Sequence, residues 1–145
     1  MTAHLEALLT AITGIKGVRP PADLVPYVAN LYDRRNEGGI IPGGRIEGTD
    51  WTPAFNDCHA NVNALCGADP RYRPVRGWRY FDFHNFLSFV RFTAHSIVAD
   101  ASGRLWDITP SRASQHYPFI LAEGPEEEFV QIVEVRGLGN LDHFR

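Results

Sequence analysis

The stretch HSIVADASGRLWD, residues 95–107, predicts a β-hairpin whose loop decides which side chains meet. Its DASG tetrapeptide, residues 100–103, fits a type I turn with Gly103 in the left-handed conformation, a common three-residue hairpin loop. In that register His95 and Asp107 are diagonal neighbours on one face of the hairpin, within reach of a side-chain hydrogen bond. A slip of one residue would move Asp107 to the other face. The pairing of the two side chains therefore depends on this loop.

The segments around the hairpin predict the rest of the fold. Segments rich in aromatic and β-branched residues, or alternating in polarity, predict strands at residues 74–83, 90–100, 104–110 and 128–136. Apolar residues spaced for one helical face predict helices at residues 3–15, 22–35 and 57–66. Helices followed by antiparallel strands predict an α+β fold, with N-terminal helices packed on an antiparallel sheet. A length of 145 residues predicts one domain over residues 1–145.

The stretch FNDCHANVNALCG, residues 55–67, places Cys58 at the start of the third predicted helix, with Asn56 or Asp57 as its N-cap. Unpaired backbone N–H groups and the positive end of the helix dipole lower the pKa of a thiol at that position. The resulting thiolate is nucleophilic. A nucleophile also needs a base, and the base needs a partner that orients it. The predicted hairpin offers a histidine and an aspartate for these two roles.

The neighbours of Cys58 on the helix have weaker claims to chemistry. His59 points about 100° away from it around the helix, so we expect His59 to be structural rather than the base. Cys66 is expected to pack in the core. On one helix the two cysteines would be roughly 12 Å apart, beyond the roughly 7 Å that a disulfide can bridge. Two free thiols fit a reducing compartment, which predicts a cytoplasmic protein.

Charge and hydropathy argue against two classes of partner. The net charge of −3 provides no global attraction to nucleic acid or to an anionic membrane. Four arginines between residues 71 and 79 are expected on a solvated strand edge. The N-terminal MTAHLEALLTAITGIKG has neither the basic region of a signal peptide nor an apolar run that could span a membrane. We therefore expect no nucleic-acid or membrane partner, and the oligomeric state stays open.

A long glycine-rich loop precedes Cys58. Residues 36–53, NEGGIIPGGRIEGTDWTP, contain five glycines and two prolines. Long structured loops in small domains often carry function. We expect this loop, together with the region of Trp78, to border Cys58 and form a substrate cleft.

The order CHANV, VRGW, AHSIV and GRLWDITP, within residues 51–120, resembles the papain-like and transglutaminase-like cysteine enzymes, and a group of small uncharacterised bacterial proteins built on that plan. The resemblance implies Cys58 as nucleophile, His95 as base and Asp107 as the orienting acid. It implies a cysteine hydrolase, thiol protease or acyltransferase that acts on a peptide, protein or small amide, without cofactor or metal.

The resemblance also bears on the oxyanion hole and the substrate contacts. The family often places a glutamine shortly before the cysteine, and this chain has none there. Thr52 and Asn56 are the candidate substitutes, beside the Cys58 backbone N–H. Trp51 and Trp78 are candidate substrate-binding residues.

Two other classes of function stay open from the sequence. Cys58, His59, His95 and Asp107 could supply ligands to zinc, although only the first two are close in sequence. Alternatively, the chain could be a non-catalytic interaction module in which Cys58 is merely buried. Its surface would be an aromatic run, made of Phe81, Phe83, Phe86, Phe89 and Phe92.

Overall fold

A computed structural model describes residues 14–44, 51–82, 87–110 and 117–145 of the chain. Its helical elements are the short 3-10 helices η1 (Ala22–Leu24) and η2 (Arg35–Glu37), and the α-helices α2 (Val25–Asp33), α3 (Cys58–Ala68) and α4 (Glu126–Val130). The helices predicted at 22–35 and 57–66 are thus confirmed, although α3 runs two residues further. The helix predicted at 3–15 lies almost wholly outside the described residues. None of the described helices is long and apolar enough to cross a membrane.

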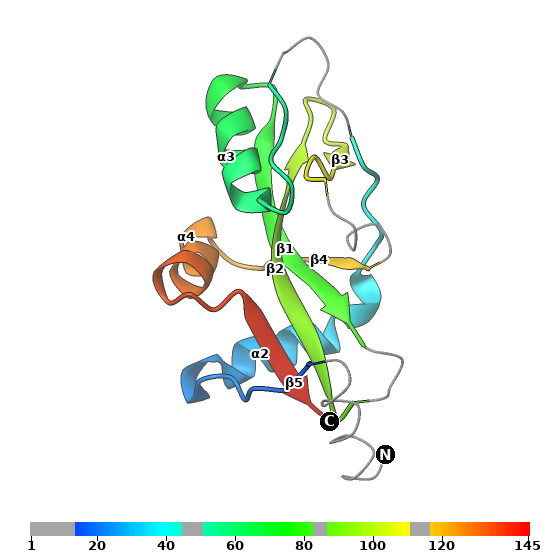
Figure 1. Ribbon diagram of the computed structural model, residues 1–145, viewed down its shortest axis with the longest axis vertical. Coiled ribbons are helices and arrows are strands. Elements are labelled where there is room, and N and C mark those ends of the chain that lie inside the picture. The colour runs from blue at the N-terminus through cyan, green and yellow to red at the C-terminus, as the bar shows by residue number, and fades with distance from the viewer. Residues whose placement is uncertain (1–13, 45–50, 83–86, 111–116) are drawn as a thin grey trace.

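The fold is α+β, and its sheet is built on one long hairpin (Figure 1). Strands β1 (Arg73–Phe81) and β2 (Phe89–Ala99) pair antiparallel along their whole length. The other strands are β3 (Leu105–Trp106), β4 (Phe119–Leu121) and β5 (Asn140–Phe144), and each pairs antiparallel with one of the first two. The order β3-β2-β1-β4 makes β1 an interior strand.

One edge of β2 is shared by two short strands that leave a gap between them. β5 pairs with residues 89–93 of β2, and β3 pairs with residues 98 and 99. His95 lies in the interval between these two pairings. In Figure 1, α3 and β3 occupy one end of the long hairpin, and α2 and β5 the other.

The predicted hairpin register is confirmed. Gly103 has φ +85°, and the Asp100 N–H donates to the Arg104 carbonyl oxygen at 2.9 Å. Val98 lies opposite Trp106. Continued by one residue, this register sets Asp107 on the same face of the sheet as His95.

The prediction of a strand at residues 128–136 is wrong. The segment is helical, first as α4 and then as a π-helical stretch, Gln131–Val135. Phe129 and Ile132 are buried, a spacing of three residues that serves a helix, and three glutamates occupy the first turn. The strands β4 and β5 had no clear sequence signal, since each is short and depends on its pairing with the hairpin.

The core lies on both faces of the hairpin: Val75, Ile97, Ala99 and Phe119 pack together on one face, and two clusters lie on the other. At one end Val62 and Leu65 of α3 pack on Val98 and Ile108. A larger cluster joins α2, the hairpin and α4; it consists of Leu24, Val28, Leu31, Trp78, Val90, Phe92, Ala94, Ile120, Phe129, Ile132 and Leu141.

The predicted aromatic run is partly accounted for by this core. Phe89 and Phe92 are buried, and Phe81 is half-buried. Residues 83 and 86 lie outside the described part of the chain. The described members of the run therefore pack within the protein and do not form an aromatic docking surface.

The expectation for the four arginines is corrected in part. Arg71 and Arg73 are exposed, but Arg76 and Arg79 are half-buried because β1 is an interior strand and not an edge.

Gly77 allows the tight packing of β4 on β1, and this predicts the effect of a methyl group. A Cβ at Gly77 would collide with the Phe119 ring and the Ile120 carbonyl oxygen. Gly77→Ala should therefore lower the free energy of unfolding by about 1–3 kcal/mol, measured by urea denaturation. The matched control is Gly67→Ala in α3, where a Cβ would have no described neighbour within 4 Å. It should leave stability unchanged or raise it by up to about 1 kcal/mol. Equal stability of Gly77→Ala and the wild type would contradict the packing of β4.

Candidate active site

Cys58 is the first residue of α3, and Asp57 is its N-cap, as the sequence predicted. Within the described structure the Asp57 side chain makes no capping hydrogen bond. The N–H groups of the first helical turn therefore stay open next to the half-buried sulfur.

Asn61, one turn into α3, fixes the helix start to the segment that follows β3. Its side chain is 3% exposed. It accepts a hydrogen bond from the Ala54 N–H at 2.8 Å and donates to the Ala54 carbonyl oxygen at 2.7 Å. The same amide donates to Thr109 Oγ1 at 3.1 Å, and the Asn56 N–H donates to the Pro110 carbonyl oxygen at 3.0 Å. The helix that begins at Cys58 and the segment that follows Asp107 are thus held together.

His95 and Asp107 form the contact that the hairpin register predicted. His95 Nε2–H donates to Asp107 Oδ2 at 2.7 Å, and the histidine is 2% exposed. The other carboxylate oxygen, Oδ1, accepts from the Thr109 N–H at 3.1 Å. Bonding at Nε2 leaves Nδ1 as the ring nitrogen that is available for chemistry.

The glycine-rich loop reaches this site through its first half. The Asp107 N–H donates to the Pro42 carbonyl oxygen at 2.9 Å, and the Gly44 N–H donates to the Asp107 carbonyl oxygen at 3.0 Å. Residues 42–44 therefore run beside Asp107, and the predicted border with Cys58 stays a prediction. Residues 45–50 lie outside the described part.

Cys58 is the natural partner of the open nitrogen of His95. His95 Nδ1 is buried and makes no hydrogen bond of normal length to any residue that the structure describes. Burial alone lowers the pKa of this imidazole, but the hydrogen bond to Asp107 and the interaction with Cys58 outweigh burial and raise the pKa above its usual value. Catalytic hydrogen bonds are often long before substrate binds.

The pKa of the Cys58 thiol is lowered to about 5. Burial by itself raises this pKa, and interactions with His59 and His95 more than offset that effect. Burial raises the pKa of the other thiol, Cys66. The structure thus makes one of two free cysteines a thiolate at neutral pH.

His59 also acts on Cys58, since its imidazole lowers the pKa of the thiol. Its Nδ1 lies 2.6 Å from Ser96 Oγ, which also accepts a hydrogen bond from Arg76 Nη1 at 2.7 Å. Arg76 can only donate, so Ser96 Oγ accepts from it and still has a proton and a second lone pair with which to bond His59 Nδ1. The ring also packs edge-on against Phe129, so the structural role that we expected is present as well.

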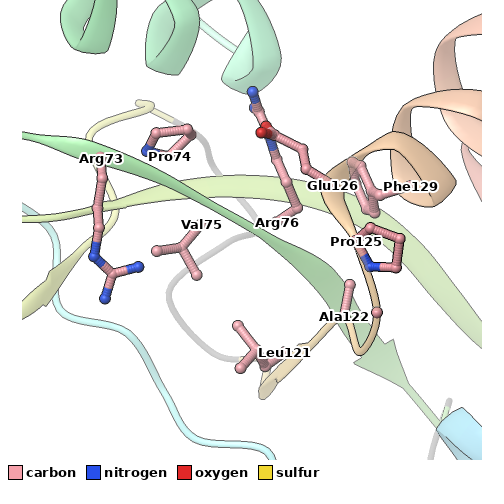
Figure 2. A pocket seen from close by; sticks show the side chains of 10 residues that line it. Arg73, Pro74, Val75, Arg76, Leu121, Ala122, Pro125, Glu126 and Phe129 are labelled. Atoms are coloured by element: carbon pink, nitrogen blue, oxygen red, sulfur yellow. The ribbon is translucent and has the colours of Figure 1, made fainter.

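A pocket of about 240 Å³ lies beside Arg76, between β1, the end of β4 and the start of α4. Figure 2 shows the side chains of Arg76 and Glu126 meeting on one side of β1, while Arg73 and Val75 point to the other side. Arg76 Nε donates to Glu126 Oε1 at 2.8 Å. The catalytic candidates do not line this pocket.

The structure places the other predicted site residues as follows. Thr52 and Asn56 are exposed, and Asn56 has φ +57°. Trp51 is 36% exposed.

Trp78 is different, because it is fully buried and its Nε1–H donates to the Tyr27 hydroxyl at 3.0 Å. The predicted substrate contact by Trp78 is therefore wrong: in this interior strand its side chain faces the core. Phe55, 55% exposed, is the large apolar side chain that the structure leaves open just before α3.

The zinc alternative finds no support in the geometry. Within the described ranges no group of three or more His, Cys, Asp or Glu side chains is arranged to hold a metal ion. Asn61, Ser96 and Arg79 were missed as site residues, because their contacts depend on tertiary structure and carry no local signal in the sequence.

Comparison with known proteins adds no assignment: no family model, no curated protein and no solved structure matches this chain.

The two cysteines should differ sharply in alkylation. With a pKa of about 5, Cys58 is mostly thiolate at pH 6, whereas Cys66 is almost wholly protonated. Iodoacetamide at pH 6 should modify Cys58 at least about tenfold faster than Cys66, as read by peptide mass spectrometry over time. The reactivity of Cys58 should fall as the pH drops through about 5. Equal rates at pH 6 would show that Cys58 is an ordinary buried thiol.

Proposed function

We propose that this protein is a cysteine-dependent enzyme that acts on an amide or related acyl bond through Cys58, His95 and Asp107. The observation that carries the proposal is the arrangement of His95. Its Nε2 is fixed by Asp107 at 2.7 Å, and its buried Nδ1 is left for a thiol whose pKa is about 5. Nucleophile, base and orienting acid, each with the electrostatics that its role needs, are the parts of nucleophilic catalysis.

The first half of the reaction is acylation. The Cys58 thiolate attacks the acyl carbon, and the carbonyl π electrons move to oxygen to give a tetrahedral oxyanion. As the C–N bond breaks, the His95 imidazolium gives its Nδ1 proton to the leaving amine. A thioester on Cys58 and a neutral imidazole remain.

The oxyanion requires donors that are already in place. The backbone N–H of Cys58, at the open N-terminus of α3, is one such donor. The side chains of Thr52 and Asn56, both exposed ahead of the helix, are the candidates for a second. The backbone N–H of Asn56 is excluded from this role, because it is already bonded to the Pro110 carbonyl oxygen.

The second half of the reaction resolves the thioester. Neutral His95 takes a proton from water or from an amine, which attacks the acyl carbon and releases the Cys58 thiolate. Water gives a peptidase, amidase or deamidase, and an amine gives an acyltransferase. The substrate is a peptide, a protein or a small amide in each case, and no cofactor enters the steps.

The fold is compatible with a papain-like or transglutaminase-like core. A helix that begins at the cysteine precedes antiparallel strands that carry the histidine and the acid, which is the order that the sequence resemblance implies. The pairing of β2 with β3 brings His95 to Asp107 in the way such a triad needs.

Substitution of the three residues tests the triad. Cys58→Ala should abolish turnover of an amide or thioester substrate, and His95→Ala should cost nearly as much, because the base is lost. Asp107→Asn should lower kcat/KM by about 100-fold or more, because the amide cannot stabilise the imidazolium. Circular dichroism checks folding of each variant.

An acyl probe supplies the readout where the natural substrate is not known. Mass spectrometry should find a thioester adduct on Cys58 in the wild type, and none in Cys58→Ala. An adduct that forms equally in His95→Ala would contradict the assigned base, and the absence of any adduct on folded wild-type protein would contradict the proposed function.

The pH profile separates the two histidines. Wild-type activity should rise through about pH 5, where Cys58 ionises, and fall where the His95 imidazolium loses its proton, above its ordinary 6.5. The two limbs belong to the coupled pair. His59→Ala should move the acid limb to higher pH, because one interaction that lowers the thiol pKa is gone, and should keep most of the maximal rate. If His59→Ala were inactive at every pH, His59 and not His95 would be the base.

A further inference from the structure

Arg79 is a half-buried, positively charged residue on an interior strand of the sheet, close to the proposed site. It lies on the interior strand β1, opposite Thr93 of β2 on one side and Phe119 of β4 on the other. Side chains two residues apart on a strand share a face. Arg79 therefore shares a face with Gly77, which lies directly opposite His95.

The absence of a side chain at Gly77 shapes this face. The Phe119 ring approaches so closely that a Cβ at Gly77 would collide with it. The same ring packs edge-on against the His95 imidazole, with centroids 6.3 Å apart. One aromatic ring thus lies beside His95 and opposite Arg79.

The guanidinium of Arg79 is not satisfied by the residues that the structure describes. Its Nε and Nη1 are buried and have no hydrogen-bond partner there. The other half-buried arginines have partners: Arg34, Arg76 and Arg91 each form an ion pair with a carboxylate, and Arg35 Nη1 donates to the Tyr32 carbonyl oxygen. A buried cation without a partner is costly and is seldom retained without a use.

Its electrostatic neighbours are the catalytic candidates. Burial lowers the pKa of Arg79, and the negative charges of Asp107 and Cys58 act in the opposite direction. Among the described contacts, neither Asp107 nor Cys58 hydrogen-bonds to Arg79. The two carboxylate oxygens of Asp107 accept from His95 and from the Thr109 N–H. Arg79 therefore has donors left for a group that is not part of the described protein. Arg79 as a whole is half-buried, whereas its Nε and Nη1 are covered, so a group from solvent reaches these two atoms only as the side chains that cover them move aside.

We propose that Arg79 binds a carboxylate of the substrate, close to the acyl carbon that Cys58 attacks. The inference rests on the proposed function and adds a substrate class to it: acyl compounds that carry a carboxylate within a few bonds of the reacting carbon. The planar guanidinium presents N–H donors in a fork that matches the two oxygens of a carboxylate. The bound anion would satisfy Nε and Nη1 and would orient the acyl group toward the sulfur.

Alkylation of Cys58 by three small reagents tests this without a known substrate. Iodoacetate and N-iodoacetylglycine carry a carboxylate at different distances from the reacting carbon, and iodoacetamide carries none. For each protein the rate with an anionic reagent is divided by the rate with iodoacetamide. For at least one anionic reagent this ratio should be about tenfold higher in the wild type than in Arg79→Gln, which is the size of one charge-assisted contact. Arg79→Lys keeps the charge but loses the fork, and should give an intermediate ratio.

The matched control is Arg73→Gln, which removes the same charge from the same face of β1. It lies six residues away, or about 20 Å along the strand. This variant should keep the wild-type ratio, and Cys66 in each protein reports the intrinsic difference between the reagents.

The outcomes separate the two proposals. If Cys58 reacts rapidly with iodoacetamide at pH 6 but the ratio is the same in wild type and Arg79→Gln, the carboxylate site is contradicted and the thiolate stands. A parallel loss of all three rates in Arg79→Gln would show that Arg79 acts only on the thiolate, which also overturns the site. If Cys58 is slow toward every reagent in the wild type, the proposed function itself fails. A variant that fails to fold by circular dichroism is replaced by Arg79→Lys, whose ratio must then fall below that of the wild type.

Discussion

The hydrogen bond between His95 and Asp107 is the interaction on which the site depends. It exists because of the hairpin loop that lies between the two residues in the sequence. Gly103 turns the chain at φ +85°, and the strand register that follows puts the two side chains on one face. β3 then ends after Trp106, so Asp107 leaves the sheet edge and its backbone pairs with residues 42–44. The edge of β2 beside His95 is left clear between β3 and β5.

The charges around Cys58 counteract the effect of burial on the pKa of its thiol. A half-buried thiol would ordinarily be held in its neutral form. Here two imidazoles act on the sulfur from different elements, one on the helix that carries it and one on β2. They are held by different partners, Ser96 for His59 and Asp107 for His95. We therefore propose that both histidines favour the thiolate and that only His95 transfers a proton.

Local signals in the sequence predicted the parts of this arrangement that local chemistry determines. The hairpin loop followed from the residues around Gly103, and the start of α3 followed from Asp57. The helix at Phe129 was mistaken for a strand, since its apolar residues are mostly β-branched and tertiary packing outweighs that local preference. The burial of Trp78 and Arg79 could not be predicted, because it depends on the pairing of β4 with β1, which makes that strand interior.

The central claim is that Cys58 and His95 form a thiolate–imidazolium pair before substrate binds, and ¹⁵N NMR of the His95 imidazole measures it directly. In the wild type the midpoint of the titration should lie above the ordinary 6.5, so both ring nitrogens should be mostly protonated at pH 6. In Cys58→Ala the midpoint should fall, because the thiolate that favours the charged ring is gone, although the bond to Asp107 remains. A ring that titrates at the same pH in both proteins would contradict the ion pair.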